Sequence, residues 1–122
     1  MTCVLDASAM LAFLVGETGA DQVDDAFAGP TACSAVNWSE VAQKVSSSGR
    51  DWSLGRTLLL SSGLSIEPVT LADAEWAARR WVKGSGLSIA DRCCLALGER
   101  LDAIVLTADA AWGHDGRIRQ IR

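Results

Sequence analysis

The sequence Ala-Ile-Val-Leu-Thr at residues 103–107 decides the fold class, because a short and continuous apolar run of this kind is typical of a fully buried strand. Three similar runs precede it, a weaker one near Ile118 follows it, and helical segments separate them. The earlier runs lie at residues 2–5, 31–35 and 66–69. Apolar strands that alternate with helices indicate a parallel sheet covered on both faces. We therefore predict one α/β domain over residues 1–122, with a central parallel sheet of about four to five strands and helices on both faces.

Length and composition agree with a single globular domain. The 122 residues are 49% hydrophobic and 21% charged, which provides a core and is too apolar for a disordered chain. The longest apolar run, residues 9–15, is far shorter than the ~18 residues that a membrane span needs. The first apolar stretch has no basic segment before it and contains Asp6. We therefore expect no signal peptide, no membrane partner and a cytoplasmic location.

The net charge of −4 argues against a nucleic acid as partner on bulk charge alone. Such binding would need a local site, with metal ions to supply positive charge. The four cysteines do not suggest a zinc site, because Cys93 and Cys94 are adjacent and lack the CxxC spacing. We expect them to be reduced thiols that pack as small apolar side chains.

Four acidic residues stand just beyond predicted strands or near the start of the helices that follow them. Ligands of an open parallel sheet bind outside the carboxyl ends of its strands. Acids that are distant in sequence can therefore meet at one edge of the sheet. They are Asp6 after the strand at 2–5, Glu40 in the first turn of a helix predicted at 38–45, Asp91 at the start of a helix predicted at 89–101, and Asp109 beyond Thr107.

Each of these acids also has a purely structural explanation as a helix cap. Ser88–Asp91 fits a capping box, and Asn37–Glu40 fits a looser version of it. Asp6 can cap the first helix, and Asp109 can cap the short turn that follows it. The pattern recurs at Thr70–Asp73, to which we assign no function, so it is not specific for a site.

Convergence of the four acids favours a metal site. Carboxylates held close together repel one another, and burial makes their charged forms costly. Mg²⁺ or Mn²⁺ resolves this conflict, since both are hard cations that prefer oxygen ligands and keep several waters. Such a site lowers the pKa of a bound water and stabilises charge on a phosphoryl group. The chemistry that this suggests is metal-dependent hydrolysis of a phosphodiester bond.

Four stretches of the chain, in this order and at this chain length, resemble a known family. The chain is similar to a PIN domain, and in particular to the small toxic ribonucleases of VapBC toxin–antitoxin pairs. The resemblance runs nearly end to end. The stretches are Val4–Ala9, Asn37–Val41, Leu87–Arg92 and Leu106–Trp112.

The resemblance implies a function and a set of site residues. It implies an endoribonuclease that cleaves RNA with Mg²⁺ or Mn²⁺, acts as a homodimer and is inhibited by a cognate antitoxin. Ser8 and Thr107 would be polar supporting groups. None of the family's acids is missing from the sequence. The implied catalytic and metal-binding residues are Asp6, Glu40, Asp91 and Asp109.

Three arginines are candidates for RNA binding. Arg79 and Arg80 lie on a helix predicted at 72–82, where they would contact phosphates or simply form a solvated face. Arg92 directly follows Asp91, so it would contact RNA or pair with a nearby carboxylate. The residues alone leave both alternatives open for each arginine.

A second class of function remains open from the residues alone. In it the protein is a non-catalytic or phosphoacceptor-type α/β binding or signalling domain whose acids serve only as helix caps. A phosphoacceptor domain needs an adjacent acidic pair after the first strand and a lysine beyond a late strand. Here Asp6 has apolar neighbours, and both lysines, Lys44 and Lys83, fall in predicted helices. Metal binding would distinguish the nuclease from a binding module.

Overall fold

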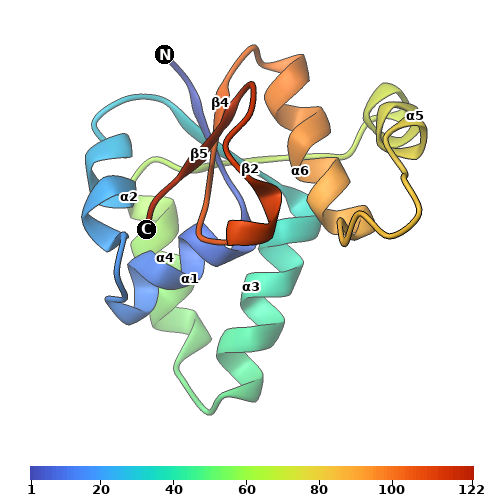
Figure 1. Cartoon of the computed structure of the whole chain (residues 1–122). Helices are drawn as coiled ribbons and strands as arrows, with labels where there is room; N and C mark the ends of the chain where they lie inside the picture. Colours follow the sequence, from blue (N-terminus) through green and yellow to red (C-terminus); the bar gives the residue numbers. More distant parts are fainter.

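The computed structural model describes all residues, Met1–Arg122, and contains one parallel five-stranded sheet with the order β3-β2-β1-β4-β5 (Figure 1). All four pairs of neighbouring strands are parallel. The strands are β1 (Cys3–Leu5), β2 (Thr31–Ser34), β3 (Ser65–Glu67), β4 (Ile104–Thr107) and β5 (Ile118–Gln120). The helices are α1 (Ala7–Val15), α2 (Ala20–Ala26), α3 (Ala35–Ser47), α4 (Trp52–Ser61), α5 (Leu71–Arg79), α6 (Ile89–Arg100) and the short 3₁₀ helix η1 (Ala110–Trp112).

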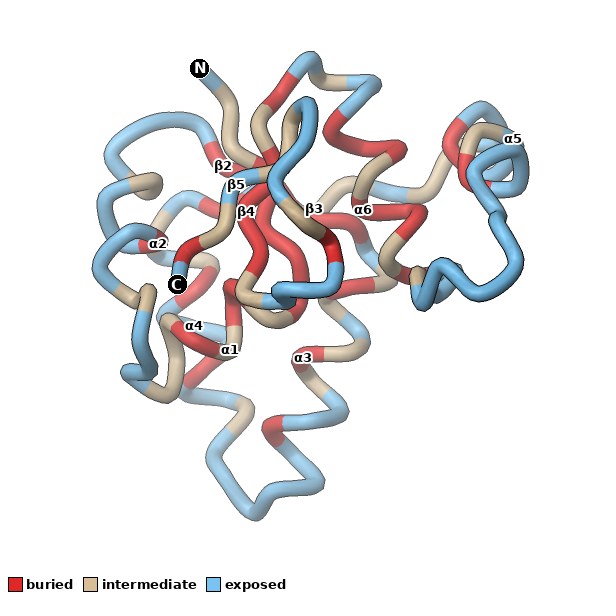
Figure 2. The backbone as a smooth tube through the Cα atoms, viewed as in Figure 1, coloured by how far each residue is buried: buried red, intermediate tan, exposed pale blue.

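Successive side chains of the central strands enter two separate cores, one on each face of the sheet. On β1, Leu5 packs with residues of α1, α3 and α4, whereas Val4 packs with residues of α6. On β4, Leu106 belongs to the same core as Leu5, and Val105 belongs to the same core as Val4. The buried strands therefore lie at the centre of the molecule, with exposed segments around them (Figure 2). This confirms the prediction of a single α/β domain with a parallel sheet and helices on both faces.

The contact between α6 and β4 is unusually close because a glycine lies between them. A Cβ atom on Gly98 would stand only 2.5 Å from Cγ2 of Val105. Any residue with a side chain at this position would push α6 away from the sheet. The outer helix α5 packs against α6 and lies at the side of the molecule (Figure 1).

Two predicted helices differ from the structure by three residues at one end. The third helix begins at Ala35 instead of 38, because Ser34 ends β2 and also caps α3, its hydroxyl accepting from the Val36 N–H at 3.3 Å. The helix predicted at 72–82 ends at Arg79, and the following residues, Trp81 among them, are exposed. None of the helices has the length and apolar character needed to cross a membrane.

Candidate metal centre

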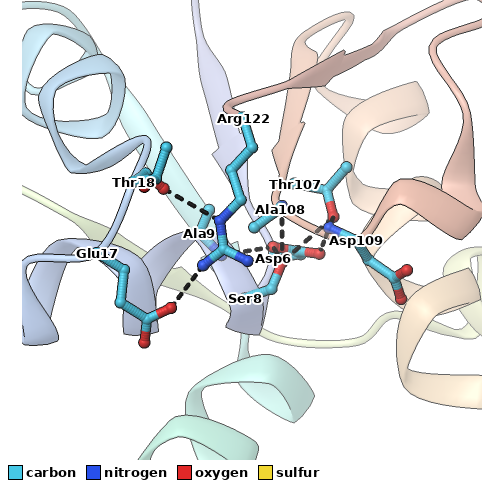
Figure 3. A network of polar contacts seen from close by, with 9 residues as sticks. All are labelled: Asp6, Ser8, Ala9, Glu17, Thr18, Thr107, Ala108, Asp109 and Arg122. Atoms are coloured by element: carbon cyan, nitrogen blue, oxygen red, sulfur yellow. Dashed lines mark hydrogen bonds and ion pairs between the residues drawn. The ribbon is translucent and has the colours of Figure 1, made fainter.

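Asp6 forms the centre of a polar network at the carboxyl end of β1 (Figure 3). Its Oδ1 accepts from the Ser8 hydroxyl at 2.7 Å and from the Ala9 N–H at 2.8 Å. Its Oδ2 accepts from the Thr107 hydroxyl at 2.5 Å. The backbone contact makes Asp6 the N-cap of α1, and the Thr107 contact ties it to the end of the neighbouring strand β4. The carboxylate is therefore held in place from three sides.

The environment of Asp6 makes its negative charge costly. Asp6 is buried, with only 4% of the residue exposed to solvent. Burial raises the pKa of this carboxyl above its usual value, and the charge of Asp91 adds to the rise. The hydrogen bonds from Thr107, Ser8 and Ala9 act in the opposite direction without cancelling the effect of burial. A cation beside Asp6 would relieve this cost.

The two supporting residues predicted from the sequence both contact Asp6. Thr107 donates to Asp6, and its own hydroxyl accepts from the Asp109 N–H at 3.0 Å. Ser8 accepts from the Ala108 N–H at 2.8 Å. These contacts join the start of α1 to the turn after β4, so they fix the backbone position of Asp109 relative to Asp6.

Asp91 and Asp109 are also helix caps, as the structural alternative predicted. Asp91 closes the capping box of α6, with its Oδ2 accepting from the Ser88 N–H at 2.9 Å. Asp109 caps η1, with its Oδ1 accepting from the Ala111 N–H at 3.0 Å. These backbone contacts do not exclude a second role, because they occupy only one oxygen of each carboxylate. Oδ1 of Asp91 and Oδ2 of Asp109 accept no hydrogen bond from the protein.

Glu40 differs from the other three acids in how it is held. Because α3 begins at Ala35, Glu40 lies in the second turn of the helix instead of the first. Asn37 is not an N-cap, so the looser capping box is wrong at this position. Its side-chain Nδ2 instead donates to Oε1 of Glu40 at 2.8 Å, within the helix. The Asn37 amide was not among the candidate site residues, and its spacing to Glu40 was the only sequence signal for it.

The buried thiol of Cys94 lies within electrostatic reach of three of the acids. This cysteine on α6 is fully buried, and burial raises the pKa of its thiol well above the usual value. The negative charges of Asp6, Asp91 and Glu40 raise it further, together with that of Cys33. Electrostatic influence on a single thiol requires that the three carboxylates come near it from α1, α6 and α3.

The four acidic side chains do not form a complete metal-coordination shell in this structure. No group of three His, Cys, Asp or Glu side chains is placed so as to hold a metal ion between them. Mutual repulsion and the capping contacts explain why carboxylates at one edge stay apart. The donor set still fits Mg²⁺ or Mn²⁺, since all four side chains offer carboxylate oxygens and three of them keep one oxygen without a protein donor.

The arginines predicted to bind RNA lie away from this network. Arg79 ends α5, and Arg80 directly after it stacks over the Trp76 ring, 4.5 Å from the ring centroid. Arg92 is buried, and its NH1 donates to the backbone carbonyl of Ala77 at 2.7 Å. Neither sequence-based alternative for Arg92 included this contact. It docks the last turn of α5 onto α6, which favours a structural role.

Arg122 connects the C-terminal end of the chain to the loop between α1 and α2. It follows Ile121, whose N–H donates to the Thr107 carbonyl at 3.0 Å, and Figure 3 shows its side chain in the same close view as Asp6. Its guanidinium donates to Glu17 at 2.5 Å and to the Thr18 carbonyl at 3.1 Å. The ion pair fastens the chain after β5 to the loop between α1 and α2.

Replacing Arg92 with leucine is expected to destabilise the fold by about 1–3 kcal/mol, because a buried carbonyl at the end of α5 loses its charged donor. Urea unfolding followed by circular dichroism measures this change. Lys83→Gln, at an exposed position, is the matched control and should stay within about 0.5 kcal/mol of the parent protein. An Arg92→Leu protein as stable as the parent would contradict the docking role.

Comparison with known proteins identifies the fold family. The sequence model of the family described as PIN domain matches residues 3–114, which is most of the chain. The chain belongs to the PIN domain family. A separate search of curated proteins finds no match.

Three solved structures that resemble this PIN domain are VapC toxins or toxin–antitoxin complexes. A toxin–antitoxin complex from Klebsiella pneumoniae has 19% identity and a TM-score of 0.75, with 98% of both chains covered. Mycobacterium tuberculosis VapC20, described as a toxin that cleaves the sarcin-ricin loop, has 16% identity and a TM-score of 0.66, with 87% of each chain covered. DNA-bound VapBC from Salmonella typhimurium has 13% identity and a TM-score of 0.68, covering 100% of this chain and 99% of that one. At these identities the likeness shows the fold.

Proposed function

We propose that this PIN domain is a metal-dependent endoribonuclease and the toxin of a type II toxin–antitoxin pair. The observation that carries the proposal is the Asp6 carboxylate, which is buried, accepts hydrogen bonds only from Ser8, Ala9 and Thr107, and forms no ion pair with a cationic side chain. The charges of Asp91 and Glu40, on two other helices, raise the pKa of the same buried Cys94 thiol as the charge of Asp6, which supports a common site. A divalent cation is the ligand that such a set of carboxylates would take.

Asp6, Glu40, Asp91 and Asp109 would hold Mg²⁺ or Mn²⁺ in this proposal. The bound ion would activate a water for hydrolysis of an RNA phosphodiester bond and offset charge on the phosphoryl group. Thr107 and Ser8 keep the Asp6 carboxylate in place by donating to both of its oxygens. The capping contacts hold one oxygen of Asp91 and one of Asp109, and they leave the other oxygen of each carboxylate without a protein donor.

The partners are proposed from the related structures. Two of them are complexes of a toxin with its antitoxin, which supports a cognate antitoxin as the inhibitor of this chain. One is described as a toxin that cleaves the sarcin-ricin loop, which supports RNA as the substrate. A homodimer is part of the same proposal.

A non-catalytic binding domain is the second candidate, because three of the four acids do cap helices. The two functions differ in whether a divalent cation binds. A ligand that prefers the native state raises its stability, so Mn²⁺ should raise the melting temperature only if the acids form a metal site.

Purified protein, free of antitoxin, is expected to cut total cellular RNA into discrete products with Mg²⁺ or Mn²⁺ and to leave it intact with EDTA. Asp6→Ala should give no products. Asp51→Ala is the matched control, because Asp51 caps α4 in the same manner but does not belong to the candidate site. A protein that neither binds Mn²⁺ nor cleaves RNA would leave the acids as helix caps. Mapping the product ends would identify the substrate.

A further inference from the structure

The side chain of Asn37 is buried at the start of α3 although it is polar. The residue is only 1% exposed, and it is among the largest fully buried side chains of the protein. Its Nδ2 donates to Glu40, whereas its Oδ1 is buried without a hydrogen-bond partner in the protein. An unpaired buried carbonyl lowers stability, so an apolar side chain of similar size would serve the core better. The amide therefore needs a reason other than packing.

The orientation of this amide follows from the chemistry of its neighbour. A rotated amide would place Oδ1 against Oε1 of Glu40, and two oxygen acceptors repel each other at 2.8 Å. Nδ2 must therefore face the carboxylate. A carboxylate that accepts a side-chain donor at this distance is restricted in its rotamers.

Glu40 is the one acid of the site that no backbone N–H holds. Asp6, Asp91 and Asp109 each accept from the backbone of their own helix start. Glu40 lies in the second turn of α3, where the backbone N–H groups already bond to carbonyls of the preceding turn. Its side chain also has one more rotatable bond than aspartate, so ordering it costs more entropy. Asn37, three residues earlier on the same helix face, supplies the donor that the backbone cannot.

We propose that Asn37 is a positioning residue of the metal centre, which holds Glu40 ready to take a divalent cation. The inference rests on the proposed metal-dependent function and extends it to a residue outside the four acids. Oε2 of Glu40 accepts no hydrogen bond from the protein, so the contact with Asn37 fixes the side chain and leaves this second oxygen available to a ligand.

Mn²⁺ binding to the full chain, measured by isothermal titration calorimetry without RNA, tests this role. Asn37→Leu keeps the branching of the side chain at Cγ, with a somewhat larger volume, and removes its donor. We expect its dissociation constant for Mn²⁺ to rise by roughly 10- to 100-fold, as for other residues that orient metal ligands. Its melting temperature in EDTA should equal or exceed that of the parent protein, because the unpaired carbonyl is gone. Ser39→Ala, an exposed neighbour on α3, is the matched control and should bind like the parent.

A double-mutant cycle shows whether Asn37 acts through Glu40. In a Glu40→Ala background, Asn37→Leu should weaken Mn²⁺ binding no further, because the side chain that Asn37 holds is absent. Asn37→Ala provides the same cycle if leucine does not fit the site. Equal losses in both backgrounds would overturn the positioning role, and so would parent-like Mn²⁺ affinity in Asn37→Leu. If the parent protein itself binds no Mn²⁺, the proposed metal centre fails and the role of Asn37 fails with it.

Discussion

Asp91→Asn is expected to lower the rate of RNA cleavage by roughly 10³-fold or more while the protein stays folded. A metal ion contributes several kcal/mol to such a reaction, and each 1.36 kcal/mol corresponds to about a factor of ten in rate. Asparagine keeps a side-chain oxygen that can accept from the Ser88 N–H, so the capping box of α6 survives in part. The main loss is the negative charge of Asp91, which a bound cation would need.

The rate of cleavage of an RNA oligonucleotide with the mapped site measures this effect, and circular dichroism reports the fold. Asp51→Asn changes a capping acid in the same way at α4 and should retain full activity. Full cleavage by a folded Asp91→Asn protein would remove Asp91 from the metal centre. An unfolded Asp91→Asn protein would show that the cap is its main role.

Asp6→Asn is expected to abolish cleavage and, in EDTA at neutral pH, to raise the melting temperature. Burial raises the pKa of Asp6, so the ionised carboxylate costs stability above the pKa of an unfolded aspartate. The cost disappears as the pH falls and the folded carboxyl becomes protonated. The stability advantage of Asp6→Asn should therefore be largest at neutral pH and shrink as the pH is lowered through the raised pKa of Asp6.

Thermal unfolding of both proteins in EDTA across this pH range measures the trend. Addition of Mn²⁺ should reverse the order, because the parent protein gains stability from a ligand that the asparagine variant cannot hold. Asp73→Asn is a useful contrast, since Asp73 is also buried but forms an ion pair with Arg100 at 3.1 Å. Removing that charge should lower stability at neutral pH. An Asp6→Asn protein less stable than the parent at neutral pH in EDTA would contradict the account of Asp6.

Much of the fold could be predicted because its signals are local. The apolar runs of β1 and β4 and the acids that follow them place Asp6 and Asp109 at one edge of a parallel sheet. The capping box predicted at Ser88–Asp91 is confirmed for the same reason, since all its atoms lie within four residues.

The features that escaped prediction depend on how distant segments meet. Glu40 fell in the wrong helical turn because Ser34 both ends β2 and caps α3, which leaves no turn residues to mark the boundary. Arg92 bonds to Ala77, fifteen residues earlier, and nothing near Arg92 in the sequence indicates that α5 packs over it. Asn37 and Glu40 are spaced as in a capping box. Whether they form a cap or a contact inside the helix depends on where α3 begins, which the sequence did not indicate.

The absent side chain of Gly98 has a consequence for how this site can vary. Gly98 lies seven residues after Asp91 on α6, about 10 Å along the helix axis. Its missing Cβ lets the helix lie directly on Val105 of β4, the strand that ends in Thr107. A single methyl group here would tilt α6 and move Asp91 relative to Asp6. Gly98 has no reactive group and lies two helical turns from Asp91, but a substitution there would still change the geometry of the candidate site.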